Sequence, residues 1–183
     1  DILSGDVNPS GKLPYTYPKF EQSLITYDHK PSQNLDQKME GAYDYGAETS
    51  VQYPFGFGLS YTSFEYTNLK IDKKEFVPGE LITISVDVKN SGSVTGKESL
   101  LLFTSDLVAS LTPDVRRLRA FDKVELQPGQ SKTVSFTINA DELAFVNANG
   151  KWTIEEGEFR FQVGDLADIA KCTQTKIWDT PNR

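Results

Sequence analysis

From residue 64 onward the apolar positions of the chain recur at every second residue. Residues 82–88 read ITISVDV, and residues 134–138 and 159–163 repeat this alternation. A period of two is typical of a β-strand with one buried face. Residues 100–103, LLLF, form a continuous apolar run. That run favours a central strand covered on both faces, although periodicity alone also permits a buried helix.

Two turn signals precede these alternating segments. Residues 77–80 read VPGE and residues 127–130 read QPGQ, each with Pro in second place and Gly in third. Pro presets φ for the second position of a type II turn, and Gly supplies the positive φ of the third. The pattern predicts about seven strands between residues 64 and 163, arranged as an antiparallel β-sandwich. Only residues 141–145, DELAF, look briefly helical.

The first third of the chain has a different texture. Residues 1–20 are rich in Gly and Pro, and Leu13, Tyr15 and Tyr17 alternate with proline and threonine in an extended pattern. Proline cannot donate to a ladder, so this stretch predicts an edge strand at most. Residues 21–60 show no sustained period, as expected of a functional loop or a linker packed on something else. The predicted fold is therefore an all-β sandwich preceded by an extended, mostly irregular segment.

Composition and charge narrow the function classes. The chain has 183 residues and a net charge of −7, so a phosphate backbone would be repelled and nucleic-acid binding is not expected. It contains no apolar run of about 18 residues, so no transmembrane helix is predicted. One Cys excludes an intramolecular disulfide, and one Cys with one His excludes a His/Cys metal cluster. No cofactor or metal is expected. A start at Asp1 without Met looks like a cut-out or processed segment.

The residue types that could act as nucleophiles are few. A Ser-His-Asp triad would need His29, which lies in a polar stretch without a nucleophile elbow, so a surface or capping role is favoured. Cys172 follows Lys171, and a half-buried small side chain is favoured there over a reactive thiol.

Charged and aromatic clusters are more numerous but not diagnostic. Glu155 and Glu156 are expected to diverge into solvent from a hairpin turn, rather than to form a catalytic carboxylate pair. The basic run at residues 116–119, RRLR, fits either interdomain ion pairs or a strand edge protected by charge. Trp152 is expected in the core, with stacking of exposed rings on sugars as the less favoured fate of the aromatic residues.

Two long motifs resemble a known family. Residues 5–14, GDVNPSGKLP, resemble the G-D-x-N-P-S-G-K-L-P segment that closes the α/β sandwich domain of glycoside hydrolase family 3 enzymes, the β-glucosidase and β-xylosidase group. Residues 53–64, YPFGFGLSYTSF, resemble the P-F-G-Y-G-L-S-Y-T-x-F signature that introduces the fibronectin type III-like domain of that family. At residues 41–46, GAYDYG, the chain lacks an Arg that many members carry.

The resemblance implies the C-terminal structural module of a retaining β-glycosidase, such as a β-glucosidase acting on terminal β-linked glucose of oligosaccharides. It implies an end of the α/β sandwich domain at 1–20, a linker at 21–60 and a fibronectin type III-like domain at 61–183. The family's nucleophilic Asp belongs to an N-terminal barrel and its acid/base Glu lies upstream of this segment. We therefore expect no catalytic residue here, no hydrolysis by this chain alone, and the barrel and α/β sandwich domains as partners.

Two further expectations accompany this interpretation. The alternative is a stand-alone carbohydrate-binding or adhesive sandwich, which would show a row of exposed rings, whereas a linking module would show apolar surface at residues 1–60. A secreted or periplasmic location is expected. Residues 55–58, FGFG, are interpreted as a packing hinge, with both rings buried where glycine lets the backbone approach a neighbouring surface.

Overall fold

The computed structural model describes residues 1–20, 25–31 and 51–179, and nearly all of its regular elements are β-strands. The 3₁₀ helix η2 spans Ala140–Leu143. The strands are β1 (Tyr17–Pro18), β2 (Val51–Tyr53), β3 (Phe64–Ile71), β4 (Glu75–Phe76), β5 (Leu81–Asn90), β6 (Gly96–Asp106), β7 (Arg117–Leu126), β8 (Ser131–Asn139), β9 (Phe145–Val146), β10 (Trp152–Ile154), β11 (Gly157–Val163), β12 (Leu166–Cys172) and β13 (Lys176–Trp178).

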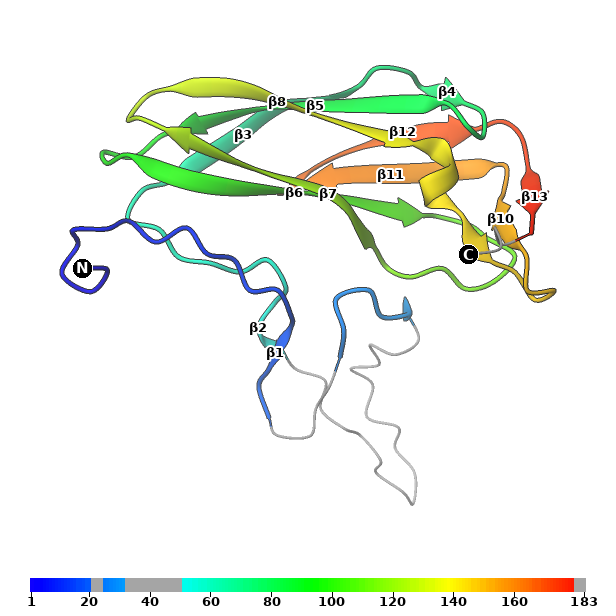
Figure 1. The fold of residues 1–183 in the computed structure, drawn as a ribbon, viewed down its shortest axis with the longest axis horizontal. Coiled ribbons are helices and arrows are strands. Elements are labelled where there is room, and N and C mark those ends of the chain that lie inside the picture. Colours follow the sequence, from blue (N-terminus) through cyan, green and yellow to red (C-terminus); the bar gives the residue numbers. More distant parts are fainter. Residues whose placement is uncertain (21–24, 32–50, 180–183) are drawn as a thin grey trace.

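Two sheets face each other and form the sandwich (Figure 1). One sheet has the order β3-β5-β8, and the other has the order β4-β12-β11-β6-β7. All of their strand pairs are antiparallel except β4 with β12, which is parallel. A small sheet, β13-β10-β9, closes one end, and the two-stranded β1-β2 ribbon belongs to the N-terminal segment. The predicted antiparallel β-sandwich of the fibronectin type III-like class is confirmed.

The alternating pattern produces the core as predicted. In β5 the side chains of Ile82, Ile84, Val86 and Val88 are fully buried, while the residues between them are partly exposed. β8 pairs with β5 in register along its whole length and buries its own alternate residues on the same face. From the opposite sheet, Phe161 and its neighbours in β11 complete the core. Burial of these side chains drives the packing of the sheets.

Both predicted Pro-Gly turns are present. Gly79 has φ of +86° and Gly129 has φ of +76°, values that a side chain would disfavour. The Glu80 amide donates to the Val77 carbonyl at 3.2 Å, and the Gln130 amide donates to the Gln127 carbonyl at 2.9 Å. These hydrogen bonds from the fourth to the first residue close the turns that lead into β5 and β8.

Strand β6 is central and is covered on both faces, as its apolar run predicts. It lies between β11 and β7, and its Leu100 and Leu102 side chains are fully buried in the core. On its outer face, Phe103 contacts the ring of Phe55 at 6.1 Å and the ring of Tyr27 at 6.0 Å between centroids. Phe55 and Tyr27 stack on each other at 4.3 Å. The N-terminal segment therefore supplies the outer cover of β6.

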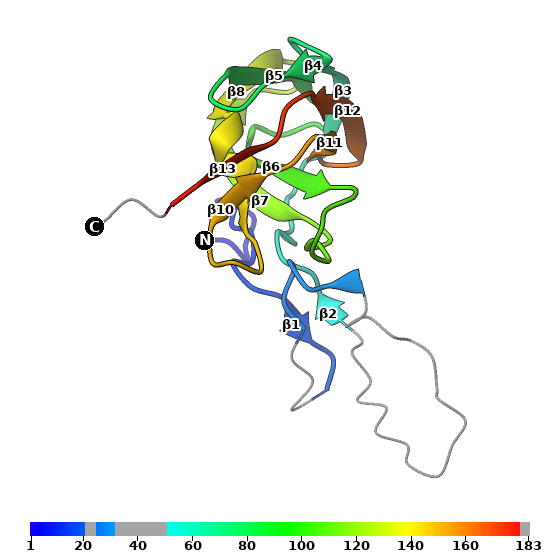
Figure 2. The same cartoon turned by 90° about the vertical axis from the view of Figure 1, so that its right-hand side faces the viewer.

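Glycines allow this segment to approach closely. A Cβ at Gly58 would meet the Gly11 carbonyl oxygen at 2.3 Å, and one at Gly56 would meet the Leu101 side chain at 2.8 Å. The Leu13 amide donates to the Phe57 carbonyl, and the Gly56 amide donates to the Leu13 carbonyl. Residues 11–13 and 56–58 thus run side by side against the sheet, and beyond them the β1-β2 ribbon projects away from the sandwich (Figure 2).

Polar contacts extend the same attachment. Lys12 Nζ lies 3.1 Å from the buried Glu98 carboxylate, which also accepts a hydrogen bond of 2.7 Å from the Tyr66 hydroxyl. Burial and the nearby Glu98 raise the pKa of Tyr66. Asn8 Nδ2 donates to the Thr95 carbonyl at 3.0 Å, and Lys123 Nζ donates to the Ser10 carbonyl at 3.0 Å. The segment is therefore attached to the sandwich by several bonds distant in sequence.

The packing-hinge hypothesis for residues 55–58 is correct for one ring and wrong for the other. Phe55 is half-buried against Tyr27, whereas Phe57 is 36% exposed and contacts the Tyr53 ring at 4.8 Å. The glycines do provide the close backbone approach that was expected. Phe57 is exposed because the backbone turns at Gly56, where φ is +82°, and directs the two rings to different sides.

Other expectations need correction. Glu155 and Glu156 do not lie in a hairpin, because β10 pairs with β9 and β13 while β11 pairs with β6 and β12. They connect two sheets instead.

Nine described strands begin between residues 64 and 163 rather than about seven, since the two-residue β4 and β9 carry no periodic signal. Strand β12 has no apolar alternation, because its inner positions include Asp168 and Ala170. The helical hint at 141–145 corresponds to η2, which ends at Leu143.

The proposed domain boundaries at 20 and 60 remain predictions. Residues 21–24 and 32–50, which include the GAYDYG stretch at 41–46, lie outside the described residues. The described part of 1–60 contains only the two short strands β1 and β2, in keeping with an extended segment.

Hydrogen exchange should separate the two parts of the chain. The amides of Ile82–Val88 lie in β5, which is paired on both sides, so we expect them to exchange only through global unfolding. The amides of Val51–Tyr53 lie in a two-stranded ribbon, which is marginally stable by itself, so they should exchange through local opening. Equal protection of the two sets would contradict this account.

Two phenylalanine truncations should differ in their effect on the free energy of unfolding. Phe161 is fully buried, so Phe161→Ala should destabilise the chain by about 3–5 kcal/mol. Phe57 is exposed, so Phe57→Ala should cost less than about 1 kcal/mol in the same chain. Urea unfolding of both variants measures the difference, and a loss for Phe57→Ala as large as that for Phe161→Ala would show that the ring is buried in solution.

Candidate functional site

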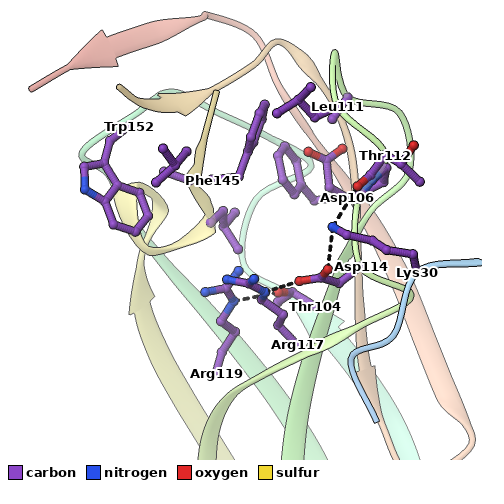
Figure 3. Close-up of a pocket in the computed structure, with 16 residues that line it drawn as sticks. Lys30, Thr104, Asp106, Leu111, Thr112, Asp114, Arg117, Arg119, Phe145 and Trp152 are labelled. Atoms are coloured by element: carbon purple, nitrogen blue, oxygen red, sulfur yellow. Dashed lines mark hydrogen bonds and ion pairs between the residues drawn. The ribbon is translucent and has the colours of Figure 1, made fainter. Parts of the chain in front are cut away.

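A pocket of about 410 Å³ opens at the end of the sandwich where the five-stranded sheet meets the small sheet (Figure 3). Its walls come from the end of β6, the loop at 107–115, the start of β7, η2 with β9, and Trp152 of β10. Lys30 of the N-terminal segment also lines it. Segments distant in sequence therefore meet here, as they do in many binding sites.

Three charged side chains form one wall of this pocket. Lys30 Nζ lies 2.6 Å from Asp114 Oδ1 and donates a second hydrogen bond of 2.8 Å to the Thr112 carbonyl. Arg117 Nε donates to the other carboxylate oxygen of Asp114. Although burial works in the opposite direction, the hydrogen bonds from Lys30 and Arg117 hold the pKa of Asp114 below its ordinary value. Asp114 is thus a fixed anion that links the N-terminal segment to β7.

Arg119 lies deeper in the same wall. Its Nε donates to Thr104 Oγ1 at 2.9 Å, which fixes the guanidinium over the end of β6. Burial, followed by repulsion from Arg117, lowers the pKa of Arg119 from its ordinary value, yet an arginine remains charged. Its Nη groups make no hydrogen bond to any other side chain or carbonyl within residues 1–20, 25–31 and 51–179. They are available as donors.

Asp106, which also lines this pocket, has a pKa well above the ordinary value of an aspartate. Burial raises its pKa to about 6, with a further increase from the nearby Glu155, while the hydrogen bond from the Val108 amide opposes the shift. That amide lies 3.2 Å from Asp106 Oδ1. The carboxylate therefore has acceptor capacity left and pays a desolvation penalty when ionised.

The remaining wall is apolar. Trp152 and Phe145 are partly buried, and Leu111 is exposed at the rim. In Figure 3 these side chains lie on one side of the pocket and Lys30, Arg117 and Arg119 lie on the other. Such a combination of rings with a few polar groups is suited to binding a small molecule that has both an apolar face and hydroxyl groups.

Asp114 is unsuited to acid catalysis. Asp114 is neutralised by two cations, so it cannot serve as a general acid near neutral pH. Within the described ranges, no group of three or more His, Cys, Asp or Glu side chains is placed to hold a metal ion. No helix in those ranges has the length and apolar character needed to cross a bilayer.

The candidate nucleophiles of the sequence lie apart from this pocket. His29 Nδ1 is 2.7 Å from the Thr26 carbonyl, in a turn of the N-terminal segment, as the capping interpretation expects. Cys172 is fully buried, more than the half-buried position expected, and its thiol donates to the Gln174 carbonyl at 3.2 Å. Burial raises the pKa of the Cys172 thiol, so a reactive thiolate is disfavoured.

Glu155 and Glu156 diverge as expected, although not into solvent alone. Glu155 Oε2 accepts a hydrogen bond of 2.8 Å from the Ser110 amide, and Glu156 Oε1 lies 3.7 Å from Lys171. The connection between two sheets directs these side chains to different neighbours. They do not form a carboxylate pair.

The basic run lies on β7 and just before it, at the edge of the five-stranded sheet. Arg116 stacks over the Phe103 ring at 4.5 Å, while Arg117 and Arg119 line the pocket. A charged strand edge is therefore correct, but two of the three guanidinium groups are partly buried rather than solvated. Trp152 packs against the core, as expected, and also borders the pocket.

Sequence reasoning missed Asp106, Asp114 and Lys30. Nothing in the local sequence marks them, because each is an ordinary charged residue in a polar stretch. Lys30 and Asp114 meet only because the N-terminal segment crosses to the loop at 107–115. A signal of this kind exists only in three dimensions.

A second surface feature lies on the β1-β2 ribbon and on the residues next to it. Tyr15, Tyr17, Tyr53 and Phe57 are all exposed, and we call these four residues the aromatic row. Successive centroids are 6.1, 6.1 and 4.8 Å apart, with interplanar angles of 35°, 61° and 30°. The rings are therefore contiguous but not coplanar. Exposed rings gathered in this way are a candidate interaction surface.

Two family models match different parts of the chain. Residues 1–61 match the model of the glycosyl hydrolase family 3 C-terminal domain, and residues 98–167 match the model of the fibronectin type III-like domain. A lysosomal β-glucosidase of Dictyostelium discoideum is 41% identical over 176 residues, covering 90% of this chain and 20% of the relative. A β-xylosidase of Formosa agariphila is 38% identical over 165 residues, covering 90% of this chain and 22% of the relative.

A solved structure gives the same result in three dimensions. A β-glucosidase from Erythrobacter marinus superimposes with a TM-score of 0.84 at 31% identity, covering 94% of this chain and 23% of that protein. The chain thus spans about a fifth of the length of the relatives that it matches. These matches, together with the sandwich and its attached N-terminal segment, identify the chain with the C-terminal region of the glycosyl hydrolase family 3 proteins.

Proposed function

We propose that this chain is the C-terminal structural module of a retaining β-glycosidase that hydrolyses terminal β-linked glucose from oligosaccharides. The N-terminal segment would join the sandwich to the barrel and α/β sandwich domains that hold the catalytic carboxylates. The observation that carries the proposal is the aromatic row, defined above as Tyr15, Tyr17, Tyr53 and Phe57. It leaves apolar rings exposed on the part of the chain that matches the family 3 C-terminal domain.

The geometry of the row favours a protein interface over a sugar platform. Its rings are tilted by 30° to 61° from one neighbour to the next, so they do not present the flat surface on which a sugar chain stacks. The β1-β2 ribbon also has only two short strands, and an isolated ribbon of this kind is marginally stable. Burial of the row against the rest of an α/β domain would stabilise both.

The sandwich side of the module is already attached. Phe55 and Tyr27 cover Phe103 of β6, and Lys30 pairs with Asp114, which also bonds Arg117 of β7. The N-terminal segment is therefore connected to both strands. We also propose that the terminal sugar is glucose rather than xylose. We propose further that the enzyme is secreted or periplasmic. The relatives named above include both a β-glucosidase and a β-xylosidase.

The isolated chain should hydrolyse no aryl β-glucoside or β-xyloside. The reason is that the resemblance places both family carboxylates outside it, and the second carboxylate of the pocket, Asp114, is already paired with Lys30 and Arg117. Release of nitrophenol is the measurement, with a complete family 3 enzyme as the positive control. Turnover that persists through purification, and that Asp106→Asn abolishes, would contradict the assignment.

The aromatic row should matter in a complete enzyme that carries this chain. Tyr17→Ser should destabilise that enzyme by about 2–4 kcal/mol if Tyr17 lies near the centre of an interface. Phe121→Ser is the matched control, because Phe121 is 75% exposed on β7 and is not one of the four rings. Thermal unfolding and the Michaelis constant are measured together.

We expect Tyr17→Ser to lower the unfolding midpoint with little change in the Michaelis constant, and Phe121→Ser to change neither. A Tyr17→Ser enzyme with normal stability but weaker substrate binding would move the row to the substrate site. Equal effects of the two substitutions would remove the case for an interface.

A further inference from the structure

We propose that the pocket beneath Trp152 is a binding site for one neutral sugar ring. This inference goes beyond the structural role and does not depend on it, because every group that it uses belongs to the described part of this chain. The pocket combines an aromatic wall, a carboxylate with unused acceptor capacity and a guanidinium with unused donors. A pyranose presents the complementary groups.

The size of the pocket suits a small ligand. Its volume of about 410 Å³ falls at the lower end of the range of about 300–1,000 Å³ that ligand pockets occupy. A single sugar ring fits such a volume, whereas an extended polymer would have to leave through the mouth. Part of the lining is formed by side chains held on β6, β7 and β10, and the Lys30–Asp114–Arg117 contacts tie the loop at 107–115 to β7.

The apolar wall suits the C–H face of a sugar. Trp152 is held in β10 by its pairing with Trp178 on β13 and with Val146 on β9. Its side chain lines the pocket on the same side as Phe145 (Figure 3). The electron-rich face of an aromatic ring attracts the weakly positive hydrogens of C–H bonds. Because the Trp152 backbone is already fixed by strand pairing, ligand binding there costs less conformational entropy.

The polar wall suits vicinal hydroxyl groups. Asp106 accepts one hydrogen bond among the described residues, from the Val108 amide, so its second oxygen can accept from a hydroxyl. Arg119 uses Nε on Thr104 and keeps its Nη donors for hydroxyl oxygens. Partly buried polar groups that lack partners are costly, so a ligand that supplies both donor and acceptor is favoured.

The Asp106 carboxylate favours a neutral ligand over an anion. The cations around the pocket are Lys30, Arg117 and Arg119. Asp114 already pairs with Lys30 and Arg117, and Asp106 is the other carboxylate that lines the pocket. An anionic ligand that contacted Asp106 would meet charge repulsion, whereas a neutral sugar would not.

The test is titration of the isolated 183-residue chain with D-glucose, D-xylose and sodium D-glucuronate. Binding is monitored through the NMR resonance of the Trp152 indole N–H and by calorimetry. We expect saturable binding of glucose or xylose with a dissociation constant in the millimolar range, which corresponds to about −4 kcal/mol. Asp106→Asn should weaken binding about tenfold, because the amide is a poorer acceptor than the carboxylate. Asp122→Asn, an exposed change on β7, is the matched control and should bind like the parent chain.

A pH series gives an independent readout. Asp106 has a raised pKa of about 6, so its carboxylate protonates as the pH falls from 7 to 5. Sugar affinity should fall over this interval in the parent chain and stay nearly constant in Asp106→Asn. The other charged groups around the pocket, namely Lys30, Asp114, Glu155, Arg117 and Arg119, are present in both chains and cancel in the comparison.

Three results would overturn the proposal. The first is no change of the Trp152 resonance at sugar concentrations up to about 100 mM, well above a millimolar dissociation constant. The second is tighter binding of glucuronate than of glucose, which would indicate an anion site. The third is equal affinity of Asp106→Asn and the parent chain, which would place the sugar elsewhere on the molecule. Folding of each variant is checked by the protection of the β5 amides.

Discussion

The contact between Phe103 and the rings of Phe55 and Tyr27 is the interaction on which the rest of this chain depends. A central strand of a sandwich normally buries one face, yet β6 buries both because the N-terminal segment covers its outer side. Without this cover, Leu101 and Phe103 on the outer side of the strand would be exposed to water. This cover holds residues 11–13 and 56–58 against the sheet and thereby places both the β1-β2 ribbon and Lys30.

Two surfaces follow from that attachment, and they differ in chemistry. The aromatic row on the β1-β2 ribbon is apolar, tilted and exposed, which suits burial against another domain. The pocket beneath Trp152 is concave, mixed in polarity and closed on one side by Lys30, which suits a small ligand. Because Lys30 belongs to the same N-terminal segment, displacement of the segment would open one wall of the pocket.

Most of the sandwich could be predicted from the sequence because its signals are local. The alternation in β5 and β8 and the glycines at positive φ in the two Pro-Gly turns appear in the structure as expected. Strand β12 could not be predicted, since pairing with β11 rather than apolar alternation defines it. Most residues of the candidate site could not be predicted for a related reason. Asp114 and Lys30 acquire their roles from a contact between distant segments, and Asp106 acquires its raised pKa from burial and from the nearby Glu155.

The central claim is that the aromatic row is an interface within a larger glycosidase. Hydroxyl-radical footprinting of the tyrosines tests it most directly, on this chain alone and within a complete family 3 enzyme that carries it. The account predicts that Tyr15, Tyr17 and Tyr53 are labelled in the isolated chain and protected in the enzyme, while Phe121 is labelled equally in both. Equal labelling of the three tyrosines in both proteins would contradict it.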